Sequence, residues 1–103
     1  MMTPTDYKKL QSSVKKTAGF LKILSNEDRL LILCRLVGSE CHVKQLEQEL
    51  KIEQPTLSQQ LSVLRQNNLV TTRREGKQIF YCLNSKETIA VMNILHEQFC
   101  QNE

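Results

Sequence analysis

Residues 52–82 constrain the fold more than any other part of the chain, because a helical pattern there is followed at once by a hairpin pattern. In residues 55–66, Leu57, Leu61 and Leu64 stand at i, i+4 and i+7, which predicts a helix with one apolar stripe. Strand-like alternation around a glycine turn comes directly after it. This combination predicts a helix-turn-helix followed by a β-hairpin wing.

The outward side of this predicted helix carries amides and hydroxyls and no carboxylate. Amides and hydroxyls can pair with the donors and acceptors on base edges in a DNA groove, whereas a merely solvated helix face usually carries charges of both signs. Arg65 suits a phosphate contact, or equally an ordinary surface charge. The candidate DNA-contacting residues on and beside the helix are Gln54, Thr56, Ser58, Gln59, Gln60, Ser62 and Arg65.

The hairpin pattern covers residues 69–74 and 78–83, with the turn at Glu75 and Gly76. Cations gather near this turn and suit contacts with phosphates or with the minor groove. We expect Glu75 to weaken that attraction. The candidate contacts are Arg73, Arg74 and Lys77.

The remaining pattern predicts a mainly α fold with a small β-hairpin, in the order ααααββα, within one domain spanning 1–103. Residues 1–6 look like a loose tail, and Ser25 resembles the N-cap of the second helix. The expected helices span residues 8–24, 26–37, 43–50, 55–66 and 86–101.

Composition and charge narrow the class of protein. The formal net charge is only +3, so nucleic-acid binding would depend on local clusters of cations. The first residues lack the apolar core of a signal peptide, and the longest apolar run, Leu30–Cys34, is too short to cross a bilayer, so we expect a cytoplasmic protein without membrane contact. In that compartment, four cysteines suggest thiols, a metal site or redox sensing. Neither a phosphate-binding glycine loop nor a Cys-x-x-Cys motif is present, and we expect no enzyme activity and no cofactor.

The stretch PTLSQQLSVLRQNNLVTTRREGKQIFYCL resembles the recognition helix and wing of the ArsR family of winged-helix transcriptional repressors, and the resemblance extends over the whole chain. It implies a homodimer joined through the first and last helices, with double-stranded, roughly palindromic operator DNA as the partner. The chain departs from the family at Asn26 and Glu27, where His-Pro is common.

Two of the cysteines carry a closer resemblance. By its spacing, Cys34 shares the inward face of its helix with Leu33 and Val37, and taken alone it would be a small buried apolar residue. Cys100 stands near the end of the last predicted helix. Both neighbourhoods resemble the BigR/SqrR/HlyU-like branch of the family. That resemblance implies a redox-sensing dithiol, Cys34 and Cys100, that answers reactive sulfur species or oxidants and releases operator DNA when bridged.

Other functions remain open from the sequence. A metal-responsive repressor of the same family would need more ligands than Cys41 and His42, since Lys44 stands where metal-sensing relatives have a cysteine, and we expect no metal site. His96 and Cys100 have a metal-compatible i, i+4 spacing but also lack further ligands. Cys41 and Cys82 are interpreted as incidental. The remaining alternatives are an effector-independent anti-silencing or nucleoid DNA-binding protein and a protein-binding adaptor. The sequence does not decide whether the inducer is a persulfide or a peroxide.

Overall fold

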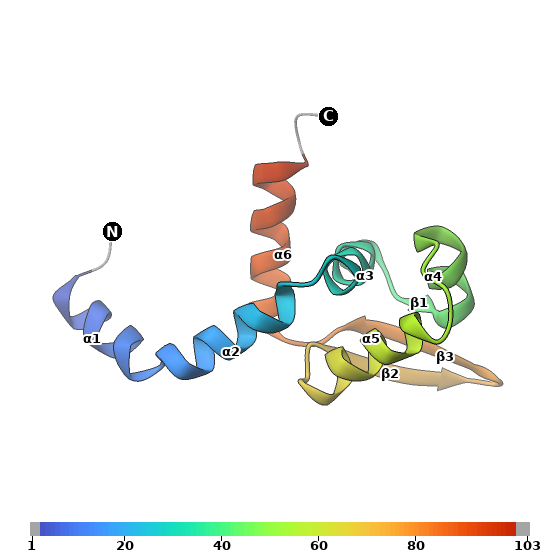
Figure 1. The fold of residues 1–103 in the computed structure, drawn as a ribbon, viewed down its shortest axis with the longest axis horizontal. Coiled ribbons are helices and arrows are strands. Elements are labelled where there is room, and N and C mark those ends of the chain that lie inside the picture. Colours follow the sequence, from blue (N-terminus) through green and yellow to red (C-terminus); the bar gives the residue numbers. More distant parts are fainter. Residues whose placement is uncertain (1–2, 101–103) are drawn as a thin grey trace.

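A computed structural model describes residues 3–100, and within them the chain is mainly helical with a small antiparallel sheet (Figure 1). Helices α4 and α5 form a helix-turn-helix, and strands β2 and β3 follow as the wing, which confirms the predicted fold class. The elements are α1 Pro4–Ser12, α2 Val14–Leu24, α3 Glu27–Gly38, β1 Cys41–His42, α4 Val43–Leu50, α5 Thr56–Gln66, β2 Val70–Glu75, β3 Gln78–Leu83 and α6 Lys86–Phe99.

The sheet has three strands in the order β1-β3-β2, with both neighbouring pairs antiparallel. Its register places Val70 opposite Leu83 at the base of the wing and Glu75 opposite Gln78 at the tip. Gly76 has φ +62° in the turn, a conformation that glycine adopts without steric cost. The sequence did not predict β1, because two residues are too few to show an alternating pattern.

The core lies between α3, the helix-turn-helix, the base of the wing and α6. The stripe predicted for α5 is confirmed: Leu57, Leu61 and Leu64 are buried. Burying a leucine side chain stabilises a fold by roughly 1.5–3 kcal/mol, so this stripe holds α5 firmly against the body. Other buried side chains come from α3, α4, β2 and α6: Ile32, Leu33, Leu36, Leu46, Val70 and Met92.

The N-terminal segment differs from its prediction. The expected loose tail over 1–6 is wrong from Pro4 onward, because Pro4 begins α1 and Thr3 forms a capping box with Asp6. The single helix expected over 8–24 is two helices, since Ser13 leaves the helical conformation between them. The Ser12 hydroxyl donates to the Lys9 carbonyl at 2.7 Å, a local bond that competes with continued helix.

The start of α3 also differs from its prediction. Asn26, rather than Ser25, is the N-cap, and its side chain accepts a hydrogen bond from the backbone N–H of Arg29 at 2.9 Å. The last helix ends at Phe99, followed by Cys100; Gln101, where we expected its end, lies outside the described residues.

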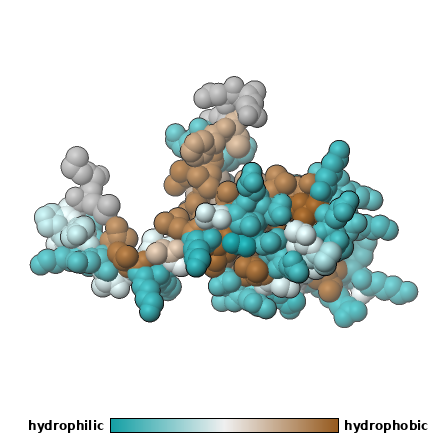
Figure 2. All heavy atoms as spheres, viewed as in Figure 1, coloured by the Kyte–Doolittle hydropathy of each residue, from teal (hydrophilic) through white to brown (hydrophobic). Residues whose placement is uncertain are grey.

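Helices α1, α2 and α6 extend away from the body of the molecule (Figure 1). Figure 2 shows apolar side chains gathered over α6 and along α2, from its junction with α1 onward. None of the helices in the described part of the chain is long and apolar enough to cross a membrane. The large exposed apolar side chains on these three helices include Leu10, Val14, Leu21, Ile89, Ile94 and Phe99.

Candidate nucleic-acid interface and cysteine pair

The polar side of α5 faces outward, because its leucine stripe packs inward and α5 contacts α3 and β2. Lys51, with φ 56°, ends α4 in a left-handed conformation, which lets the chain turn into α5. The exposed side chains on this surface are Thr56, Ser58, Gln59, Ser62 and Arg65. These five candidates therefore lie on the exposed, carboxylate-free side of α5.

Gln54 and Ser58 form hydrogen bonds with each other at the start of α5. The Gln54 side-chain oxygen accepts from the Ser58 hydroxyl at 2.5 Å and from the Ser58 backbone N–H at 3.3 Å. The first N–H groups of a helix have no partner within the helix, so Gln54 acts as a cap here. Both side chains are exposed, and their proposed contact with DNA stays a prediction.

Gln60 does not share the outward face. It follows Leu57 by three residues and precedes Leu64 by four, which places it at the margin of the buried stripe. The side chain is half-buried, and its oxygen accepts a hydrogen bond from Nη1 of Arg29 at 2.8 Å. This bond argues against the expectation that Gln60 reads DNA.

Arg73, on β2 of the wing, has two carboxylate partners within the chain. Its guanidinium donates to both oxygens of Glu40, which precedes β1, at 2.9 and 3.0 Å from Nε, and a further bond runs from Nη2. Nη1 donates to Glu75 at 2.8 Å. Because two carboxylates face one guanidinium, Arg73 offers less positive charge to a phosphate than the sequence suggested.

The same contacts lower the pKa of Glu40. The hydrogen bonds from Arg73 are the largest cause, and they favour the ionised carboxylate.

Arg74 and Lys77 remain exposed near the turn of the wing, where Nε of Arg74 donates to the Gly76 carbonyl at 3.2 Å. Arg74 and Lys77 are therefore the wing cations best placed for phosphate contact.

Cys34 is not the inward-facing residue that its spacing predicted. The core face of α3 is formed by Ile32, Leu33 and Leu36, and at 100° per residue Cys34 points nearly opposite Leu36. Its side chain reaches the surface of the single chain, where Cys34 and His96 help to line a hollow of about 330 Å³ between α3 and α6.

Cys34 and Cys100 lie close enough to influence each other. Loss of water contact raises the pKa of the Cys34 thiol, and negative charge on Cys100 raises it further. Helices α3 and α6 pack together, so these two cysteines, far apart in the sequence, lie on neighbouring elements. Both are free thiols in this structure.

The other two cysteines have different surroundings. Cys41 is buried in β1, and burial raises its pKa, as expected for a packing residue. Cys82 is half-buried on β3. His42 caps α4: its Nδ1 accepts from the Gln45 backbone N–H at 3.2 Å. Across residues 3–100, no three metal-binding side chains of His, Cys, Asp or Glu come together.

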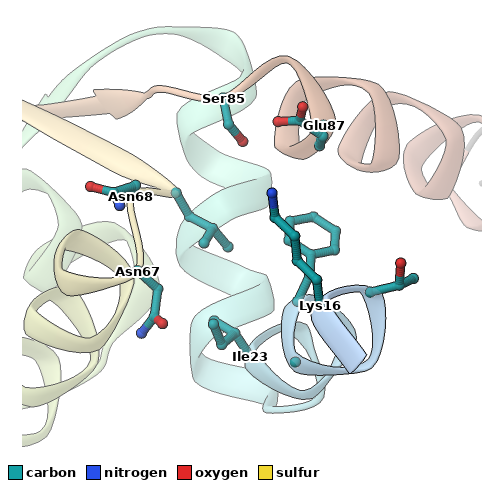
Figure 3. Close-up of a pocket in the computed structure, with 10 residues that line it drawn as sticks. Lys16, Ile23, Asn67, Asn68, Ser85 and Glu87 are labelled. Carbon is teal, nitrogen blue, oxygen red and sulfur yellow. The ribbon is translucent and has the colours of Figure 1, made fainter. Parts of the chain in front are cut away.

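A larger cavity of about 720 Å³ lies between α2, the turn after α5 and the start of α6 (Figure 3). Its lining combines the apolar side chains of Phe20, Ile23 and Leu69 with polar and charged residues, and Lys16 extends across it toward Ser85 and Glu87. It contains none of the candidate DNA-contacting or sensing residues. It lies beside α2 and α6, whose exposed apolar side chains are described above.

An exposed polar helix on a helix-turn-helix, followed by a wing, defines a winged-helix DNA-binding regulator. The family described as "Bacterial regulatory protein, arsR family" matches residues 26–72. The biofilm growth-associated repressor of Xylella fastidiosa is 46% identical over 102 residues, covering 99% of this chain and 87% of that protein. The transcriptional activator HlyU of Vibrio cholerae is 39% identical over 98 residues, covering 95% and 91%. The chain therefore belongs to the arsR family of bacterial regulatory proteins.

Solved structures agree with this assignment. Reduced HlyU from Vibrio cholerae has a TM-score of 0.86 with 39% identity, covering 91% of this chain and 99% of that one. The transcriptional repressor BigR from Xylella fastidiosa has a TM-score of 0.84 with 43% identity, covering 94% and 96%. The relatives are regulators of transcription, both repressors and an activator, and this protein is a DNA-binding transcriptional regulator.

Proposed function

We propose that this regulator senses reactive sulfur species or oxidants through Cys34 and Cys100, and that bridging the two thiols releases operator DNA. The observation that carries the proposal is the packing of α3 against α6, which puts the exposed thiols of Cys34 and Cys100 on neighbouring elements; charge on Cys100 also raises the pKa of Cys34. One solved structure among the relatives is described as reduced HlyU.

The chemistry requires only two thiols and a sulfur donor. One thiolate attacks the sulfane sulfur of a persulfide, RSSH, and takes that sulfur while the donor leaves as RSH. The second thiolate then attacks the Sγ atom of the first cysteine and expels the outer sulfur as hydrosulfide, which leaves a disulfide between the two Sγ atoms. The two thiols are oxidised, and the sulfane sulfur is reduced to sulfide. With peroxide, the first product is a sulfenic acid, and the second thiol expels water.

The bridge would act on DNA binding through α3. This helix carries Cys34 on one side and packs against α5 on the other, so a tie between α3 and α6 restrains the support of the recognition helix. A shift of 1.4 kcal/mol changes affinity tenfold, so a change of a few kcal/mol empties most of an operator.

The active form in this proposal is a homodimer joined through the N-terminal helices and α6. Supporting it, α1, α2 and α6 expose apolar side chains that find no cover within the described part of the chain, among them Leu21, Ile94 and Phe99. A dimer would present two α5 helices to successive major grooves of a palindromic site.

Intact mass spectrometry of the reduced protein tests the sensing chemistry. Samples are treated separately with a low-molecular-weight persulfide, hydrogen peroxide and oxidised glutathione, and the products are mapped by proteolysis without reduction. We expect a peptide pair joined through Cys34 and Cys100, by a disulfide or with inserted sulfur. Modification confined to Cys41 or Cys82, or persistent unlinked thiols at both proposed positions, would overturn the proposal.

A further inference from the structure

Arg29, at the start of α3, donates hydrogen bonds to two other helices. Its Nε donates to the carbonyl of Ile23, near the end of α2, at 2.6 Å, and its Nη1 donates to the side-chain oxygen of Gln60, on α5, at 2.8 Å. The bond to Ile23 spans six residues and the bond to Gln60 spans 31, and both residues in the Arg29–Gln60 pair are half-buried. One guanidinium therefore joins α2, α3 and the recognition helix.

Each of the two contacts has a physical reason. The last carbonyls of a helix lack a donor within the helix, and a cation there is favoured by the helix dipole, so Ile23 is a suitable acceptor for Arg29. The amide of Gln60 accepts a bond from a charged donor, which is roughly twice as strong as a bond between neutral groups. The planar guanidinium fixes the direction of both bonds together, which a lysine ammonium would not do.

We propose that Arg29 and Gln60 are positioning residues, which set the orientation of α5 on DNA without either side chain contacting a base. This inference rests on the proposed role of α5 as the DNA-contacting helix. It assigns Gln60 a different role from its neighbour Gln59, which is exposed on the polar face. The two adjacent glutamines thus make a matched pair, one turned to DNA and the other turned to Arg29.

Glutamate substitutions distinguish the two roles. In Gln60→Glu, a carboxylate replaces the amide beside the Arg29 guanidinium, so the acceptor is kept and the bond gains opposite charge. In Gln59→Glu, the new carboxylate faces the phosphates and base edges and repels the DNA. Binding is measured with reduced full-length protein and a double-stranded fragment recovered by the wild type from a random-sequence library.

We expect Gln60→Ala to bind about tenfold more weakly, equivalent to about 1.4 kcal/mol, with an unchanged dependence on salt. Gln60→Glu should bind within about threefold of the wild type, whereas Gln59→Glu should lose more than about tenfold. Arg29→Ala should weaken binding as Gln60→Ala does, and the double variant should lose little more than either single variant.

Several results would overturn the positioning role. These are a loss in Gln60→Glu as large as that in Gln59→Glu, wild-type binding by Gln60→Ala, or losses in Arg29→Ala and Gln60→Ala that add. Circular dichroism checks that each variant is folded, and if Arg29→Ala is not, the glutamine variants alone decide. Unchanged binding in Gln59→Glu and Gln60→Glu alike would instead show that α5 does not face DNA, which would remove the premise in the proposed function.

Discussion

Arg73 lies directly opposite Phe80 in the β2–β3 ladder, and its guanidinium carbon is 4.6 Å from the centre of the Phe80 ring. The ring of Phe80 in turn meets His42 edge-on, with 5.4 Å between the ring centres. Since His42 caps α4 and Arg73 also binds Glu40, this cluster joins the middle of the wing to the first helix of the helix-turn-helix.

The wing cations should differ in their effect on DNA binding. Replacing Arg74 with Ala should weaken binding to all sequences alike and reduce the salt slope by about one unit, because a phosphate contact releases about one counterion. Arg73→Ala should change the slope less, since Glu40 and Glu75 already face that charge. Filter-binding titrations over a series of salt concentrations measure both slopes. Equal reductions for the two variants would place Arg73 in contact with phosphate as well.

The Arg73–Glu40 pair should make stability depend on pH in the acid range. The pKa of Glu40 is lower in the folded chain than its ordinary value of 4.5, so the pair contributes stability above that value. The contribution is lost as the pH falls through the lowered pKa. Thermal unfolding of the wild type and Glu40→Gln should therefore differ at pH 7 and converge in strong acid. Glu47→Gln, a change at an exposed position on α4, provides the control. If the difference in thermal stability between the wild type and Glu40→Gln persisted at a pH where carboxylates are protonated, the ion pair could not be its source.

The exposed apolar helices should determine the state of association. Ile94, on α6, is 55% exposed in the single chain, and a charge there would be buried if a second copy covers it. We expect Ile94→Asp to be monomeric in light scattering and to bind palindromic DNA much more weakly, whereas Lys44→Asp, on exposed α4, should leave the mass unchanged. A dimeric Ile94→Asp protein would place the contact elsewhere.

The reactivity of Cys34 should depend on Cys100. Burial and the neighbouring thiolate both raise the pKa of Cys34, so at neutral pH it is mostly the unreactive thiol, and its alkylation should rise about tenfold per pH unit below that pKa. In a background with Cys41→Ser and Cys82→Ser, adding Cys100→Ser removes the nearby charge and should lower the pH at which Cys34 is half reactive. Iodoacetamide labelling followed by peptide mass spectrometry measures this midpoint. The same midpoint in both proteins would mean that the two thiols do not influence each other.

The sequence predicted the helix-turn-helix because periodicity reports burial directly. The leucine spacing in α5 follows from one side of that helix packing inward, whereas the wing strands are mostly exposed or half-buried, and residue type with the glycine turn predicted them. Prediction from the sequence failed where local hydrogen bonds decide the structure. The Thr3–Asp6 capping box begins α1 inside the expected tail, and Ser13 interrupts a continuous helical pattern.

The candidate site was only partly predictable for a related reason. Residue type identified the polar face of α5, but it did not distinguish Gln59 from Gln60, because their difference depends on Arg29, distant in sequence. Likewise, the sequence predicted Arg73 to be a free cation, because Glu40, its partner in the structure, lies 33 residues away along the chain. Cys34 was taken as inward-facing, because an apolar run such as Leu30–Cys34 does not reveal which side of the helix faces the core. One missed feature could have been predicted: Thr3 and Asp6 have the spacing of a capping box, which indicates a helix that begins at residue 4.

Release of DNA by persulfide in the cysteine variants tests the central claim most directly. Fluorescence anisotropy follows the library-selected DNA fragment as persulfide is added to reduced protein, with a chelator present to exclude metal. We predict that the wild type, Cys41→Ser and Cys82→Ser release the DNA, whereas Cys34→Ser and Cys100→Ser bind it and retain it. Release that survives the loss of Cys34 or Cys100, or a wild type that keeps its DNA after its thiols are bridged, would contradict the account.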